Sequence, residues 1–139
     1  MLKEKIINQI KNKLVSQKRV AWAYLYGSFV TEEKFEDIDL AVYLDPVYLK
    51  KCPSLLKEEQ TLASDLEKAL SPRLEIDLKI LNRAPVHFQY QVLRNGKLIY
   101  FRDPSEVVRY EGDTISSYLD YKPTIQFFEK ALLERIEKW

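Results

Sequence analysis

Several kinds of residue are scarce in this sequence, and each scarcity excludes a class of protein. Cys52 is the only cysteine, so neither an internal disulfide nor a thiolate metal cage can form. His87 is the only histidine, which also excludes a zinc site built from several histidines. The sequence contains no run of ~18 apolar residues and no recognisable signal peptide. We therefore expect a cytoplasmic protein with no membrane partner.

An excess of charge of one sign is also missing. The 22 Lys and Arg residues nearly balance the 21 Asp and Glu residues, for a formal net charge of +1. Bulk electrostatics of this kind do not favour binding to nucleic acid, and we expect no direct nucleic-acid partner. The 139 residues suit one domain with a sizeable core. We therefore predict a single domain over residues 1–139.

The spacing of apolar residues predicts alternating helices and short strands. Two longer segments show helical spacing, residues 2–16 and about 47–70, the second with an interruption at Pro53. Gly96 is expected to end a further short helix in the left-handed conformation. The predicted strands span residues 20–26, 37–44, 74–80 and 97–101, and the predicted short helices span residues 29–36 and 84–93. The first strand is almost wholly apolar, so we place it centrally, buried on both faces and beside the second.

Residues 103–139 are predicted to be mostly helical. Asp103, Pro104 and Glu106 resemble a capping box, with Asp as the N-cap residue. Gly112 and Pro123 interrupt the pattern, which predicts two helices or one bent helix. The apolar and aromatic residues of this segment exceed what a short helix on a small sheet needs. They form either a partner interface or additional packing on the chain's own core.

The stretch from Tyr26 to Leu44 joins a Gly-Ser turn to a strand that carries two aspartates. Gly27 and Ser28 follow an apolar strand, where backbone N–H groups can turn toward an anion. Asp37 and Asp39 share one face of the next strand, roughly 6–7 Å apart. Like charges at that distance repel, and a divalent cation bound between them removes the repulsion. The alternative interpretation is that this Asp-x-Asp is only the solvated face of an edge strand.

Asp77, in the alternating strand at 74–80, adds a third carboxylate. Three aspartates on two strands, facing a Gly-Ser turn, are the parts needed for two-metal transfer of a nucleotidyl group. We expect Asp37, Asp39 and Asp77 to be catalytic residues and ligands of two Mg²⁺ ions, with Asp77 completing the second metal site or taking a proton. The Gly27 and Ser28 amides are expected to bind the nucleotide's terminal phosphates, aided by the N-terminus of the predicted helix at 29–36.

These residues resemble a known family. Gly27-Ser28, the run Asp37-Ile38-Asp39-Leu40-Ala41-Val42 and the later Asp77 are similar to the DNA polymerase β-type nucleotidyltransferase superfamily. The small size, together with residues 92–103, is most similar to the minimal nucleotidyltransferase (MNT) antitoxins encoded beside HEPN-domain toxins. The resemblance implies an α/β (α+β) fold with a small mixed sheet flanked by helices. It also implies Mg²⁺-dependent use of ATP and transfer of AMP to a tyrosine of a HEPN-domain ribonuclease toxin.

The chain departs from the pattern of those antitoxins at two places. Where they usually read Gly-Ser-x-Ala-Arg-Gly, residues 27–32 contain no basic residue and end in Glu32. Glu36 also stands where a serine commonly precedes the first aspartate. Both changes add negative charge near a bound triphosphate, which either slows turnover or shifts the role of the missing cation to Lys34, Lys79 or another basic residue.

Two alternative functions stay open at this point. The same fold could neutralise a toxin by binding alone, with a vestigial nucleotide site. It could also be a free-standing adenylyltransferase for a small molecule such as an aminoglycoside, although such enzymes usually need an added substrate domain.

Overall fold

A four-stranded sheet organises the chain, in the order β3-β2-β1-β4. The structure is a computed structural model and describes residues 2–35 and 37–137. The strands are β1 Val20–Tyr26, β2 Ile38–Leu44, β3 Ile76–Ile80 and β4 Lys97–Phe101. β1 pairs antiparallel with both β2 and β4, whereas β2 and β3 are parallel. The mixed sheet is therefore confirmed, and so is the central, doubly buried β1 beside β2.

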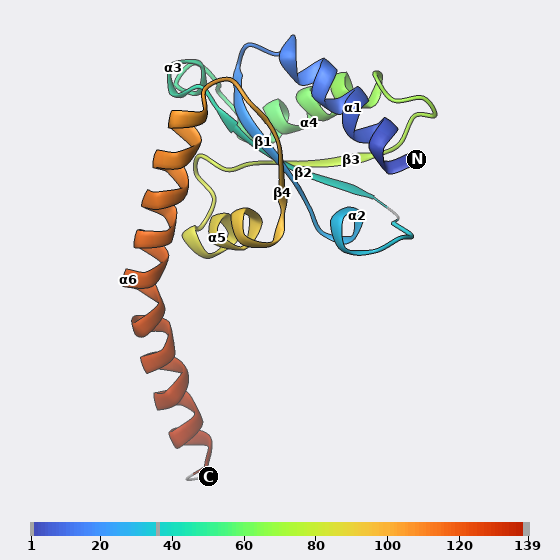
Figure 1. The fold of residues 1–139 in the computed structure, drawn as a ribbon. Helices are drawn as coiled ribbons and strands as arrows, with labels where there is room; N and C mark the ends of the chain where they lie inside the picture. The colour runs from blue at the N-terminus through green and yellow to red at the C-terminus, as the bar shows by residue number, and fades with distance from the viewer. Residues whose placement is uncertain (1, 36, 138–139) are drawn as a thin grey trace.

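Helices cover both faces of this sheet (Figure 1). On one face lie α1 (Leu2–Val15) and α4 (Leu55–Glu67), and on the other lie α5 (Val86–Asn95) and the first turns of α6 (Pro104–Glu137). Alternation in β2 sends Ile38, Leu40, Val42 and Leu44 to the α1 and α4 side, where each is 0% exposed. Asp39, Ala41 and Tyr43 consequently face the opposite side, which is the side of the candidate site.

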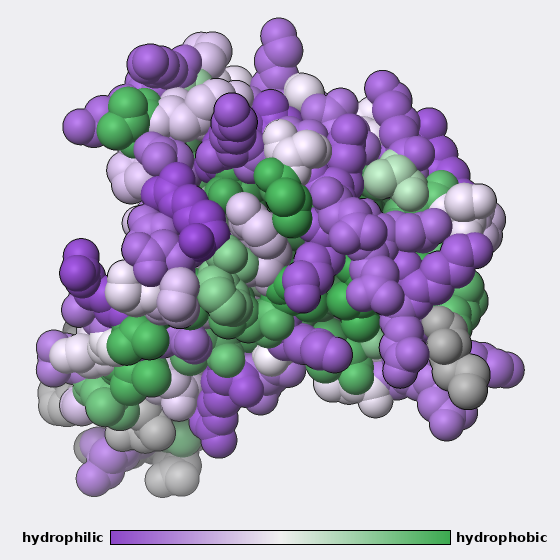
Figure 2. All heavy atoms as spheres, turned by 45° about the horizontal axis from the view of Figure 1, so that its top comes forward, coloured by the Kyte–Doolittle hydropathy of each residue, from purple (hydrophilic) through white to green (hydrophobic). Residues whose placement is uncertain are grey.

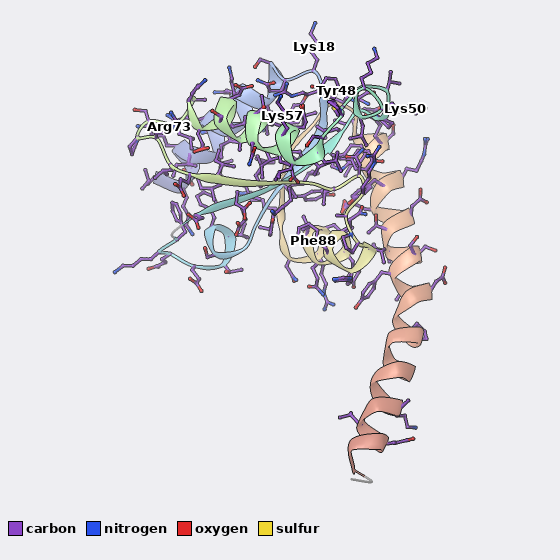
Figure 3. All side chains as sticks on the ribbon, turned by 180° about the vertical axis from the view of Figure 1, so that it is seen from behind. Lys18, Tyr48, Lys50, Lys57, Arg73 and Phe88 are labelled. Carbon is purple, nitrogen blue, oxygen red and sulfur yellow. The ribbon has the colours of Figure 1, made fainter. Side chains whose placement is uncertain are left out.

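The space-filling view shows mainly hydrophilic side chains on the face brought forward, with apolar ones in smaller patches (Figure 2). Seen from behind, Lys57 projects from α4, whereas Phe88 lies on α5 at the other side of the sheet (Figure 3). None of the helices in the described ranges is both long and apolar enough to span a lipid bilayer.

Several local predictions need correction. The helix expected at 29–36 is only the single turn α2, Ser28–Thr31. Phe29 is buried and Phe35 packs edge-on against it, with ring centroids 4.6 Å apart, so the chain leaves the helix to place both rings in the core. Gly96 is not left-handed, since its φ is −86°. A Cβ there would lie 2.5 Å from Val92 O and 2.7 Å from Leu25 O, so close backbone packing explains this glycine.

Residues 103–139 were predicted to form two helices or one bent helix, and the structure has a single helix, α6, which continues through Gly112 and Pro123. Asp103 Oδ1 accepts a hydrogen bond from Ser105 N at 3.0 Å, which confirms the aspartate cap. Glu106 does not close a capping box, because its carboxylate binds Arg102 instead. The interruption near Pro53 is confirmed, since α3 (Pro46–Leu49) and α4 are separate helices.

Candidate active site

The sheet register brings two of the three predicted aspartates side by side. Asp39 on β2 is the direct partner of Asp77 on β3, and Tyr26 at the end of β1 is the partner of Asp39. Neighbouring strands lie about 4.8 Å apart, so the two carboxylates start from adjacent backbone positions on one face. Asp37 is exposed and lies just before β2, one residue outside the strand that was predicted to contain it.

The carboxyl group of Asp39 has a raised pKa because it is partly buried and close to other carboxylates. Burial raises the pKa of its carboxyl group above the ordinary range, and the charges of Asp77 and Asp37 raise it further. Lys79 is the cation that acts in the opposite direction. Tyr26 responds similarly, because burial and then the charges of Asp39 and Asp77 raise the pKa of its phenol. The cluster therefore favours any added positive charge, as a cation-binding site does.

Gly27 ties the Gly-Ser turn to the aspartates. Its φ of 73° and ψ of −155° lie in a region that is essentially open only to glycine. A Cβ at this position would overlap Asp39 Oδ2 and would lie 3.2 Å from Asp39 Cγ. The turn therefore closes directly over the Asp39 carboxylate, which no local sequence pattern predicts.

Ser28 begins α2, whose turn is held by Val30 N donating to Gly27 O at 3.1 Å. Because this helix has only four residues, the expected support from a longer helix dipole is absent. Anion binding at the turn then depends on the local backbone amides and the Ser28 hydroxyl.

A hollow of about 390 Å³ lies beside these residues. Its wall includes two carboxylates that the site prediction missed, Glu67 of α4 and Glu75 before β3, next to Asp37 and Asp77. Glu75 shares the face of Asp77 by alternation, so the sequence contained a signal for it. Glu67 lies in the wall because α4 packs beside β3, and no local sequence pattern predicts that tertiary contact.

The donor set can be compared with the requirements of Mg²⁺. Among the side chains that the structure describes, no group of three or more His, Cys, Asp or Glu is arranged to hold a metal ion by itself. Mg²⁺ usually takes only one or two carboxylates and completes its shell with water and substrate phosphates. The hard oxygens of Asp39 with Asp37 or Asp77 fit that mode of binding, in which the substrate contributes ligands.

Two lysines approach the site. Lys79 Nζ lies 3.7 Å from Asp77 Oδ1, and both side chains are about half exposed. Lys3 reaches across from α1, donates a hydrogen bond to Glu32 O and lies over the Phe29 ring, 5.5 Å from its centroid. Lys3 therefore holds the end of α2, a contact that sequence reasoning did not predict. Lys34 is exposed on the following loop, and Glu36 lies outside the described residues.

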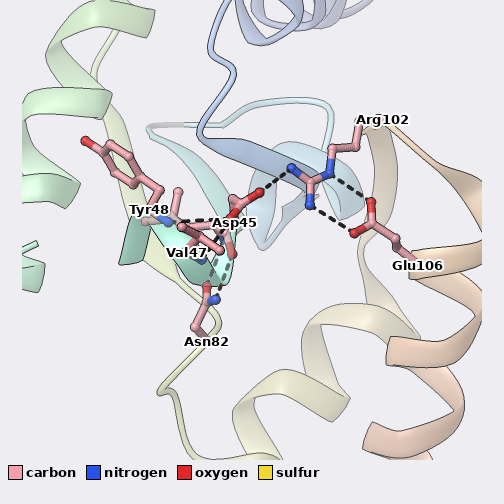
Figure 4. A network of polar contacts seen from close by, with 7 residues as sticks. Asp45, Val47, Tyr48, Asn82, Arg102 and Glu106 are labelled. Atoms are coloured by element: carbon pink, nitrogen blue, oxygen red, sulfur yellow. Dashed lines mark hydrogen bonds and ion pairs between the residues drawn. The ribbon is translucent and has the colours of Figure 1, made fainter. Parts of the chain in front are cut away.

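A larger cavity, of about 510 Å³, lies at the opposite end of the same sheet face. Its wall includes Trp22 and Tyr43, whose rings stack 4.2 Å apart. At its rim Arg102 bridges Asp45 and Glu106, with each of its three contacts between 2.8 and 2.9 Å (Figure 4). None of the three predicted aspartates lines it, so we assign the candidate active site to the smaller hollow and the adjacent Asp39 and Gly27.

Comparison with known proteins identifies the family. The family model described as Polymerase beta, Nucleotidyltransferase matches residues 8–105, and the chain therefore belongs to this family. No curated protein matches the chain. The polymerase β-like fold predicted from the Gly-Ser and Asp-x-Asp motifs is thereby confirmed.

Solved structures share the fold over almost the whole chain. The complex of a tri-AMPylated Shewanella oneidensis HEPN toxin with MNT antitoxin matches at TM-score 0.68 and 23% identity, covering 94% of this chain and 98% of the other. A toxin–antitoxin structure with AMP-PNP matches at TM-score 0.67 and 24% identity, covering 91% and 98%. The toxin–antitoxin MntA-HepT matches at TM-score 0.67 and 22% identity, covering 94% and 98%.

Proposed function

We propose that this member of the Polymerase beta nucleotidyltransferase family is an MNT antitoxin that transfers AMP from ATP to a tyrosine of a HEPN-domain toxin. The observation that carries the proposal is the register of Asp39 beside Asp77, with Gly27 closing over Asp39. The whole-chain likeness to antitoxins solved with an AMPylated HEPN toxin and with AMP-PNP supports the choice of substrates.

The reaction balances with these two substrates alone. The tyrosine hydroxyl oxygen attacks the α-phosphorus of ATP and forms a new P–O bond. The bond from the α-phosphorus to the bridging oxygen breaks, and pyrophosphate leaves in line with the attack. The hydroxyl proton passes to a carboxylate or to water. The products are the AMP-modified toxin and pyrophosphate.

The chain's own residues divide this work between binding and proton transfer. The amides of Gly27 and Ser28, with the Ser28 hydroxyl, hold the terminal phosphates. Asp37 and Asp39 would hold a cation that neutralises charge on the triphosphate, and Asp77 would complete a second cation site or accept the proton. Tyr26 packs edge-on against Phe88, with centroids 5.7 Å apart, and forms an apolar wall beside Asp39.

Mg²⁺ is the metal whose ligand preference these carboxylates fit, and we propose two ions. When bound, Mg²⁺ neutralises phosphate charge and lowers the pKa of an attacking hydroxyl. The residues that would hold it are Asp37, Asp39 and Asp77.

We assign the partner interface to α6. Its first turn packs on the sheet, where Val107 is buried in a cluster with Trp22 and Tyr24 of β1. Further along, Tyr118 stacks on Tyr90 of α5, with ring centroids 3.9 Å apart. Its C-terminal half runs beyond the rest of the fold (Figure 1). Large apolar side chains are exposed along α6, namely Val108, Ile115, Leu119 and Leu133. A helix with such residues suits docking to a helical toxin.

The test uses the HEPN protein encoded beside this chain. The two proteins are incubated with ATP and MgCl₂, and the intact mass of the partner is measured. We expect an increase by one or more AMP units, and no increase with Asp39→Asn. A toxin that is neutralised without any change of mass would instead support the antitoxin that acts by binding alone. Modification of an aminoglycoside but not of the partner would support the small-molecule enzyme.

We expect different roles for Asp37 and Asp77. Asp77 is more than half exposed and belongs to the other strand, so Asp77→Asn should slow AMP transfer strongly while weakening MgATP binding less than Asp37→Asn does. Calorimetric titration of MgATP and single-turnover rates measure the two effects separately. Equal losses of ATP affinity in both variants would contradict the division of roles.

Ser28 contributes one side-chain hydroxyl to a turn that binds chiefly through its backbone. Ser28→Ala should therefore weaken MgATP binding by only about 1–2 kcal/mol, the scale of one hydrogen bond to a charged group. Calorimetry measures this loss. Complete loss of binding would mean that the phosphates depend on Ser28 far more than the backbone arrangement suggests.

A further inference from the structure

The candidate site needs a basic side chain to bind the phosphates of ATP, and the Gly-Ser turn does not provide one. ATP brings about four negative charges to a place where Asp37, Asp39 and Asp77 already repel one another. The Gly-Ser turn contributes amides but no cation, because residues 27–32 contain no Lys or Arg. A basic side chain from elsewhere in the fold is needed to share the phosphate charge with the metal.

Lys79 is placed to supply it. Alternation along β3 puts Lys79 on the same face as Asp77, and its register partner on β2 is Ala41, which shares the face of Asp39. Its ammonium group lies 3.7 Å from Asp77 Oδ1.

The present ion pair of Lys79 is easily exchanged. The Lys79 and Asp77 side chains are 49% and 55% exposed, and exposed pairs of this kind contribute little stability. The flexible four-carbon stem of lysine lets the ammonium group move to a phosphate oxygen. Such a move would also free the Asp77 carboxylate when nucleotide arrives.

The other nearby lysines are less suitable. Lys3 is committed to Glu32 O and to the rings of Phe29 and Phe35. Lys34 lies on the exposed loop before β2, outside the strands that carry Asp39 and Asp77.

We propose that Lys79 binds the β- and γ-phosphates of ATP and supplies the cation that the Gly-Ser turn lacks. This inference rests on the proposed function, since it assumes a nucleoside triphosphate at this site. According to this proposal, β3 contributes two functional residues: Lys79 binds phosphate, and Asp77 binds a cation or accepts the proton.

The experiment titrates AMP-PNP and AMP, in MgCl₂, into the purified chain and its variants. Lys79→Met should weaken AMP-PNP binding about tenfold or more, whereas AMP, which lacks the β- and γ-phosphates, should bind as it does to the unchanged protein. Lys79→Arg should keep AMP-PNP affinity within about threefold, since the positive charge is retained. Lys18→Met is the matched control, because Lys18 is exposed just before β1 at the end away from Gly27, and it should leave both affinities unchanged.

A double-mutant cycle separates phosphate binding from an effect through Asp77. If Lys79 contacts phosphate, Lys79→Met should still weaken AMP-PNP binding in the Asp77→Asn background. Disappearance of the effect there, an equal loss of AMP affinity, or unchanged AMP-PNP affinity would each overturn the inference and leave the proposed function intact. Failure of the unchanged protein to bind AMP-PNP would overturn both. Normal AMP-PNP binding without AMP transfer to the partner would overturn the proposed function alone.

Discussion

Asp39→Asn should abolish AMP transfer, lowering its rate by more than about a hundredfold, without unfolding the protein. Asp39 is the residue on which the site converges: it is the register partner of Asp77 and of Tyr26, and Gly27 closes over its carboxylate. Asparagine keeps the volume but removes the negative charge that would bind the proposed divalent cation. Loss of the several kcal/mol of charge stabilisation that such a cation supplies accounts for the size of the effect. Intact-mass measurement of the partner over time checks the rate.

The same substitution should raise the stability of the metal-free protein. The pKa of Asp39 is raised in the folded state by burial and by its acidic neighbours, so ionisation of Asp39 is harder in the folded than in the unfolded chain. The free energy of unfolding therefore falls as pH rises through the titration range of this carboxyl group, and Asn removes that penalty at neutral pH. Thermal unfolding in EDTA should give a higher Tm for Asp39→Asn. A lower Tm, or transfer near the original rate, would contradict the role of Asp39 in a cation site.

The strands that the sequence predicts best are those with an unambiguous local pattern. Residues 20–26 and 97–101 have the predicted bounds, and the alternation of 38–44 sends its even-numbered residues to the core as expected. The period of two also places Asp39 on the face of the site. These features depend on neighbouring residues along the chain, so one sequence is sufficient to predict them.

The remaining features depend on contacts between distant segments. Propensity favours a helix at 29–36, but burial of the Phe29 and Phe35 rings and the bond from Lys3 end it after one turn. Gly112 suggests a break in the last helix, but a Cβ there would meet nothing within 4 Å, and the helix continues. The sequence indicates a Gly-Ser turn and an Asp-x-Asp strand separately. Their direct contact, with no space for a side chain at residue 27, depends on the tertiary register.

Gly27→Ala should therefore remove AMP transfer as completely as loss of the aspartate does. The backbone at residue 27 lies where essentially only glycine is stable, so alanine costs of order 1–3 kcal/mol in strain. Its Cβ would also overlap Asp39 Oδ2 and displace the carboxylate from its position. Typical domains unfold with 5–15 kcal/mol, so the variant should stay folded with a lower Tm. Gly27→Val should act in the same direction, with a larger loss of stability.

Gly112→Ala is the matched control for this prediction, because it adds the same methyl group at a position in α6 where nothing lies within 4 Å. Alanine is favoured over glycine inside a helix by roughly 1 kcal/mol, so this variant should be as stable as the original or more stable and should bind MgATP with unchanged affinity. Circular dichroism and MgATP titrations on the two variants together distinguish a general effect of removing glycine from a specific effect at the turn. Full activity of Gly27→Ala would show that the turn does not close over Asp39 during the reaction, and the phosphate site would then have to be placed elsewhere.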